Sequence, residues 1–138
     1  MDANALEIMN ERFGRDREIA LATLDGGGPA VRTIDAVYKD GSFYAITYAE
    51  SAKMKQIAIN PLVAVSGEWF TGRGVGENLG WILDGNNRGI RLMLKAAFAW
   101  YGNGHVDEND RNTIILRVKL TGGVLFSQGT KYELDFAD

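Results

Sequence analysis

The chain has 138 residues, a formal net charge of −3, 46% hydrophobic residues and 24% charged residues, a composition that predicts a single globular domain over residues 1–138. No cysteine and only one histidine are present, which excludes disulfide frameworks, thiolate metal sites and multi-histidine metal sites. The acidic balance argues against nucleic-acid and membrane partners, and with no signal-peptide pattern or membrane-spanning apolar run we expect a cytoplasmic protein.

The first part of the chain predicts one helix and three antiparallel strands. Apolar residues recur at helical spacing over residues 1–13, and Gly14 is a common type of C-terminal stop. Residues 18–24 predict a strand with apolar residues on both faces, which indicates burial on both sides. Turn sequences after residues 25 and 40 then predict hairpins into strands over residues 30–39 and 42–49.

The rest of the chain adds two more helices and further strands. A short helix begins at Ser51 and stops before Pro61, and a fourth strand follows over residues 62–69. Glycines over residues 70–76 predict a bend, a fifth strand lies within 75–84, and residues 86–101 predict the clearest helix. Residues 112–120 predict a strand that Gly122 and Gly123 break or bulge before a run over 124–127, and the tail over 130–138 has no strong signal. About six strands in hairpin order with few, short helices predict a mainly β fold, a small antiparallel barrel.

The start of the helix at Ser51 is the best candidate site. Its first backbone N–H groups lack intrahelical partners, and the hydroxyl of Ser51 and the ammonium of Lys53 lie at the same end. By strand alternation, Arg32 shares a face with Ile34, where a charge needs a partner, whereas Thr33 points to the opposite face. A phosphate would supply that partner; the alternative is a surface Arg32 and an ordinary capped helix.

Other patterns do not predict a second site. The glycines at positions 72, 74, 76 and 80 lack the spacing of a dinucleotide-binding turn and predict a bulge at a barrel corner. His105 and the carboxylates after it lack EF-hand spacing and predict a solvated loop. The aromatic residues could stack on a planar cofactor or pack in a core or interface. No catalytic triad is supported, and we predict no catalytic and no metal-ligating side chain.

Several landmarks follow one another over about residues 18–69: the hairpin LATLDG-G-P, the Arg32-Thr33 strand, the run GSFYAIT, the Ser51-x-Lys53 helix start, and Asn60-Pro61 leading into a strand. In this order they resemble the pyridoxamine 5'-phosphate oxidase-like, FMN-binding split-barrel proteins. The resemblance implies a six-stranded antiparallel split barrel. It also implies a homodimer that binds FMN in a groove at the subunit interface.

The resemblance implies a cofactor-binding set drawn from three segments of the chain: Arg32, Thr33, Ile34, Ile46, Thr47, Tyr48, Ser51 and Lys53. The first three match the segment that lines the phosphate and the ring. The next three match a strand end whose backbone meets the isoalloxazine. The last two match the phosphate-binding start of a helix.

The chain also departs from the true oxidases at informative positions. Ala52 replaces the arginine of their Arg-Lys pair, Val37 replaces a cofactor-contacting lysine, and the C-terminal Arg-x-His substrate motif is absent. These differences favour a flavin-dependent oxidoreductase of an unknown small substrate over a true pyridoxamine phosphate oxidase. The alternative is a stress-related protein that binds flavin, a deazaflavin or haem without turnover, with His105 as a candidate haem ligand.

Overall fold

A computed structural model of the protein describes residues 1–136. Its helices and strands are, in chain order, α1 (Ala3–Phe13), β1 (Arg17–Asp25), β2 (Gly28–Lys39), β3 (Ser42–Tyr48), α2 (Ala52–Ile59), β4 (Leu62–Gly67), β5 (Phe70–Trp81), α3 (Arg88–Ala97), β6 (Thr113–Ser127) and β7 (Thr130–Asp135). Two short 3-10 turns, η1 (Gly85–Asn87) and η2 (Ala99–Gly102), flank α3. No helix in the described range is long and apolar enough to cross a bilayer.

The strands form one antiparallel sheet that closes on itself. Its order is β3-β2-β1-β4-β5-β6-β7, and an additional pairing of β3 with β6 closes the first six strands into a barrel. The strand β7 extends beyond the barrel and pairs with the second half of β6. The predicted mainly β fold, a six-stranded antiparallel barrel with a few helices, is therefore confirmed.

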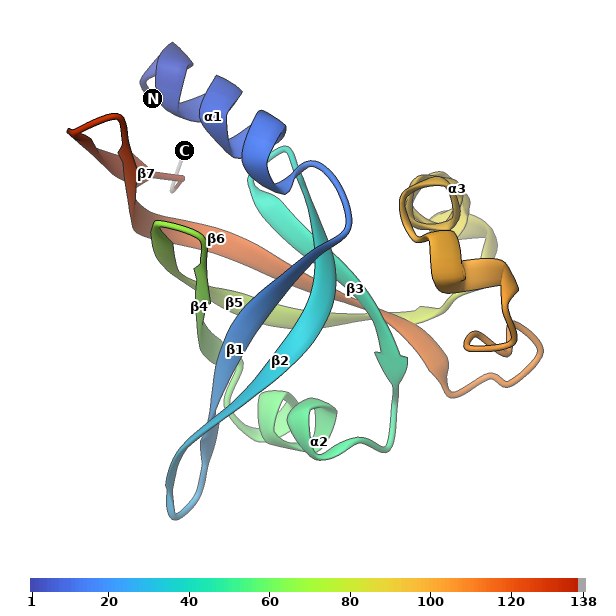
Figure 1. Ribbon diagram of the computed structural model, residues 1–138. Helices are drawn as coiled ribbons and strands as arrows, with labels where there is room; N and C mark the ends of the chain where they lie inside the picture. Colours follow the sequence, from blue (N-terminus) through green and yellow to red (C-terminus); the bar gives the residue numbers. More distant parts are fainter. Residues whose placement is uncertain (137–138) are drawn as a thin grey trace.

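The helices α1 and α2 lie at opposite ends of the barrel, as Figure 1 shows. Phe13 of α1 packs against two aromatic rings of the barrel. Its ring centroid lies 5.7 Å from that of Phe43 and 5.6 Å from that of Phe70. The helix α2 buries Met54 and Ile57 in the same core. Because these two side chains are one turn apart on one face of α2, they fix the position of its first turn on the barrel.

A second hydrophobic cluster lies outside the barrel, where α3 covers part of the wall (Figure 1). Its buried members come from the outer faces of β2, β3 and β6 and from the segment 82–101: Val37, Tyr44, Ile82, Leu94, Phe98, Tyr101 and Ile115. The first four residues of β3 are therefore buried on both faces, and pairing with β6 continues to the end of the strand at Tyr48.

Several sequence predictions need correction. The bend over residues 70–76 is wrong, because β5 runs without interruption and its irregularities are register shifts near Gly74 and near Trp81. The predicted bulge is confirmed beside Gly80, where two residues of β5 lie opposite one residue of β6. The strand β6 continues through Gly122 and Gly123, so the predicted break there is wrong, but its pairing with β5 skips Thr121, so the alternative prediction of a bulge is confirmed. The helix predicted over residues 86–101 is interrupted, because Phe98 adopts extended backbone angles and separates α3 from η2.

Two further differences concern the edges of the sheet. The sequence missed β7, and the last two residues of the tail lie outside the described range. Burial of both faces of β1 is not met within the single chain: Ala20 and Ala22 are half-buried on the outer face, and Leu24 is exposed. The outer face of β1 therefore carries uncovered apolar surface.

Candidate functional site

The start of α2 confirms the predicted helix boundary and leaves a hydroxyl unpaired. Ser51 has the extended backbone of an N-cap, and its N–H donates to the Tyr48 carbonyl at 3.0 Å. Its side chain makes no capping hydrogen bond, and its Oγ is buried without a partner in the described part of the protein. A buried hydroxyl without a hydrogen bond is costly, so this arrangement suits a ligand atom.

Lys53 lies in the first turn of α2, half-buried. Its Nζ donates to Thr47 Oγ1 at 2.8 Å, which ties the helix to the end of β3. Burial lowers the pKa of Lys53 from its usual value, and the nearby positive charge of Arg32 lowers it further. Arg32 also reaches α2, where it bonds to Gln56 one turn after Lys53, so the two cations lie near each other and an anion between them would relieve their repulsion.

Arg32 points to the inner face of β2, as alternation predicted, with Ile34 on the same side. Its guanidinium donates to the carbonyl of Leu21 at 3.3 Å, to Thr23 Oγ1 at 2.7 Å and to Gln56 Oε1 at 2.9 Å. All three acceptors are neutral. Within residues 1–136 Arg32 has no ion pair with a carboxylate, so its charge is not compensated by the protein.

Two of these contacts were missed from the sequence. Thr23 is buried on the inner face of β1, and its hydroxyl donates to Gln56 Oε1 at 2.5 Å. Gln56 lies one turn after Lys53 on α2, and its Nε2 is 3.5 Å from Asp25 Oδ2. Helical spacing from Lys53 would have identified Gln56 as a residue on the same face. No sequence pattern links Thr23 to Lys53 or Gln56.

The structure brings together only part of the predicted set. Thr47 accepts a hydrogen bond from Lys53. Thr33 directly follows Arg32 in β2, and as strand alternation predicts it is exposed on the opposite face. Tyr48 is 46% exposed at the end of β3, and its hydroxyl accepts from Asn112 Nδ2 at 3.4 Å.

The two isoleucines of the set lie on different sides of the barrel wall. Ile34 packs against the barrel core, whereas Ile46 packs against the outer cluster. Cofactor contacts by these side chains stay predictions.

The donor set at this point fits a phosphate group. Arg32 and Lys53 supply two positive charges, Ser51 supplies an unpaired hydroxyl, and the first turn of α2 contains no acidic residue. The unpaired N–H groups at the start of a helix add further donors. Such a site can hold and orient an anion. It contains no acid–base pair for proton transfer.

The residue His105 lies elsewhere. It packs edge-on against Trp100 in the segment that follows α3, with ring centroids 6.5 Å apart. Among the described residues, no cluster of three or more histidine, aspartate or glutamate side chains could hold a metal ion.

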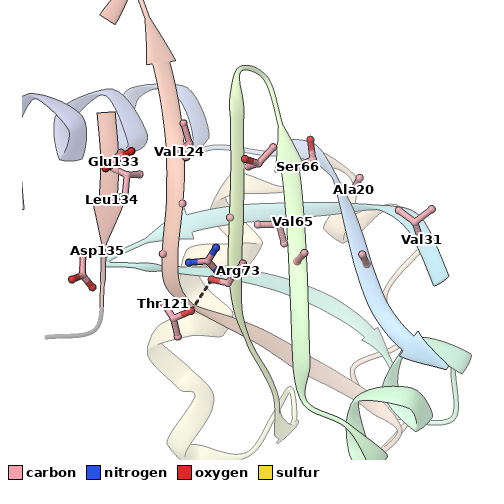
Figure 2. A pocket seen from close by; sticks show the side chains of 16 residues that line it. Ala20, Val31, Val65, Ser66, Arg73, Thr121, Val124, Glu133, Leu134 and Asp135 are labelled. Carbon is pink, nitrogen blue, oxygen red and sulfur yellow. Dashed lines mark hydrogen bonds between the residues drawn. The ribbon is translucent and has the colours of Figure 1, made fainter. Parts of the chain in front are cut away.

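A separate groove of about 830 Å³ lies on the outer face of the sheet. Figure 2 shows it between β7, which contributes Glu133 and Asp135, and the strands that carry Ala20 and Val31, with Arg73 near its middle. None of the residues at the start of α2 lines this groove. Val31 is 69% exposed, so the groove presents apolar surface to solvent.

A scan against protein-family models finds no match, and a search of curated proteins finds no similar sequence. Solved structures do match. General Stress Protein 26 from Bacillus anthracis has a TM-score of 0.70 at 16% identity, over 95% of this chain and 99% of that one. A candidate pyridoxamine 5'-phosphate oxidase from Listeria innocua has a TM-score of 0.68 at 11% identity, over 92% and 98%. The chain has the split-barrel fold of these proteins.

Other structures with this fold are named for different ligands. An FAD-binding protein from Mesorhizobium loti has a TM-score of 0.62 at 20% identity, over 89% of this chain and 90% of that one. An F420 reductase has a TM-score of 0.62 at 19% identity, over 83% and 94%. A haem-binding protein from Mycobacterium smegmatis has a TM-score of 0.73 at 14% identity, over 99% and 59%. The fold is thus shared by proteins named for flavins, a deazaflavin and haem.

Proposed function

We propose that the protein binds FMN, with the phosphate held at the start of α2, and acts as an oxidoreductase on a small molecule. The observation that carries the proposal is the pair of cations, Arg32 and Lys53, which lack a carboxylate partner in the described residues. The unpaired Oγ of Ser51 belongs to the N-cap of the helix whose first turn carries Lys53. A dianionic phosphate would pair with both charges and accept from the hydroxyl.

The residues of the site bind and orient, and a bound flavin would supply the redox chemistry. Arg32 and Lys53 would fix one end of the ligand from β2 and α2. Thr47, which bonds to Lys53, precedes the exposed Tyr48 at the end of β3. The strand β3 pairs with β6 along its whole length, which keeps this strand end in place. Orientation of this kind is the protein's main contribution in a flavin enzyme.

The test compares two ligands that share a ring and differ in the phosphate. We expect the purified protein to bind FMN at least about 30-fold more tightly than riboflavin, since two charge-assisted contacts are involved. Flavin fluorescence quenching measures both dissociation constants. Equal affinities would contradict the proposed phosphate site, and weak binding of both would contradict the proposed cofactor.

A second candidate is a protein that holds flavin, a deazaflavin or haem without turnover. Its fold is shared by General Stress Protein 26 and by a haem-binding protein, which favours this candidate. Stopped-flow reduction of the FMN-loaded protein by NADH or NADPH, followed by reoxidation with an added acceptor, separates the two. Turnover at a catalytic rate supports the enzyme, and reduction no faster than that of free FMN supports the binding protein.

We further propose that the protein is a homodimer whose partner covers the outer-face groove. Val31 and the half-buried Ala20 are apolar and uncovered, and Arg73 and Glu133 line the same groove, so two copies related by a two-fold axis could pair them. Val31→Asp should convert a dimer into a monomer in light scattering, whereas Leu92→Asp, at an exposed apolar residue of α3, should not. A monomeric wild type would contradict this proposal.

A further inference from the structure

We propose that Gln56, together with Thr23, is a positioning residue that holds Arg32 in place without neutralising its charge. The inference rests on the proposed binding of a phosphate-bearing flavin and assigns roles to two side chains in that site. The pattern that points to it is the chemistry of the acceptors around Arg32, which are a carbonyl, a hydroxyl and an amide.

The first step concerns how firmly Arg32 is held. Three hydrogen bonds reach its guanidinium from β1 and α2, and the two side-chain acceptors, Thr23 and Gln56, also bond to each other at 2.5 Å. Thr23 is almost fully buried, so its rotamer is fixed by packing. A closed triangle of hydrogen bonds restricts the guanidinium to one orientation and reduces the entropy lost when a ligand binds.

The second step concerns what remains available. A guanidinium has five N–H groups, and the bonds from Arg32 use three of them, two on NH1 and one on NH2. The Nε–H and the second hydrogen of NH2 therefore have no acceptor in the described protein. Because Thr23 Oγ1 and Gln56 Oε1 are also bonded to each other, they occupy the edge between NH1 and NH2. The edge formed by Nε–H and NH2 is left, and such an edge can bind two oxygens of a phosphate at once.

The third step explains why the side chain at position 56 is an amide. A carboxylate in the same place would accept the same hydrogen bond from Arg32 but would also form an ion pair with it. The positive charge of Arg32 would then already be paired within the protein, and its attraction for a phosphate would be weaker. A glutamine gives the orientation without this competition, and its own Nε2 faces Asp25.

The experiment uses Gln56→Glu, which preserves the shape of the side chain and adds one negative charge. We expect FMN affinity to fall by at least about 30-fold and riboflavin affinity to change by less than about threefold, because only FMN carries the phosphate. The slope of FMN affinity against salt concentration should also become shallower. Flavin fluorescence titration at several salt concentrations gives both results.

The matched control is Lys55→Gln, which changes the net charge by the same amount at the preceding residue of α2. Lys55 is largely exposed and forms only a loose ion pair with Glu50 at 3.9 Å, so we expect less than about a threefold change for either ligand. A second variant, Gln56→Met, removes the acceptor without adding charge. It should lower the affinity for FMN by about 3- to 10-fold, because Arg32 loses its fixed orientation, and leave the affinity for riboflavin unchanged.

The outcomes separate this inference from the proposed function. If wild type shows no preference for FMN over riboflavin, both fail. If wild type prefers FMN and Gln56→Glu keeps that preference, the proposed site stands and the role of Gln56 is wrong. Equal losses for FMN and riboflavin, or a loss matched by Lys55→Gln, would also overturn the inference, because they would indicate a structural or long-range effect.

Discussion

Replacing Lys53 with methionine removes its charge while keeping most of its stem, and it tests the phosphate site directly. At about 4 Å in a partly exposed site, a unit charge and a phosphate charge attract by about 4 kcal/mol before desolvation. Desolvation and the competing bond to Thr47 reduce this, and hydrogen bonds to charged groups contribute about 1.5–3 kcal/mol net. We therefore expect FMN to bind about 30-fold more weakly to Lys53→Met, with riboflavin unchanged.

The pH dependence of the same variant gives an independent check. In the free protein the pKa of Lys53 is lowered by burial and by Arg32, and a bound phosphate would raise it. Between these two pKa values the complex holds one more proton than the free protein, so FMN affinity falls as the pH rises through the lowered value toward the ordinary value of 10.5. The FMN affinity of Lys53→Met should not show this fall with rising pH.

The assay is the ratio of FMN to riboflavin affinity, measured by fluorescence quenching from about pH 7 upward, where the FMN phosphate is already dianionic. Riboflavin carries the same ring, so titration of the ring cancels in the ratio. A ratio that stays constant with pH in wild type, or that falls equally in Lys53→Met, would refute the assignment of Lys53 to the phosphate.

Two further predictions concern Ser51 and the glycines of β5. Ser51→Ala should weaken FMN by about tenfold in a fluorescence titration, since one hydrogen bond to a charged group is lost. Gly74→Ala should lower the free energy of unfolding by about 1–3 kcal/mol in urea, because the added Cβ would lie 2.5 Å from the Lys119 carbonyl oxygen. Gly85→Ala, where no atom lies within 4 Å, should change it by less than about 0.5 kcal/mol.

Local sequence signals predicted the first half of the barrel correctly because its hairpins are short and its strands alternate. The turn before Ser42 and the boundary at Pro61 are set by residues within a few positions of each other, so β2, β3, α2 and β4 could be predicted closely. The paths of β5 and β7 depend instead on distant partners. The strand β5 stays continuous through its glycines because it pairs with β4 on one side and β6 on the other.

The strand β7 illustrates the same limit. It pairs only with the second half of β6, and of its residues only Leu134 is buried, so its sequence carries almost no apolar alternation. The interruption of the helix at Phe98 also involves a distant residue, because Trp100, which follows it, donates from Nε1 to Asp16 Oδ2 at 3.2 Å. Trp100 stacks on Phe98 with ring centroids 4.5 Å apart, a contact that a continuous helix would not form between residues two apart.

Some features of the site also follow from neighbouring residues, whereas others depend on residues far apart in the sequence. The inner-face position of Arg32 follows from alternation along one strand, and the start of α2 follows from Ser51. The contact of Thr23 with Gln56 joins residues 33 positions apart, on β1 and α2, and only the closed barrel brings them together. The positions of Arg32 and of the helix start were therefore predictable from the sequence, whereas the contacts around Arg32 were not.

The free protein carries a cost that an anion would remove. Lys53 is half-buried beside another cation, and Ser51 Oγ is buried without a partner, so both weaken the fold when no ligand is bound. Lys53→Met and Ser51→Ala should then unfold at higher temperature than wild type in the absence of ligand. At an FMN concentration of 100 times its wild-type dissociation constant, wild type gains about 2.7 kcal/mol and the variants gain less. The order of unfolding temperatures should therefore reverse on adding FMN, whereas variants that merely disturb packing would stay below wild type under both conditions.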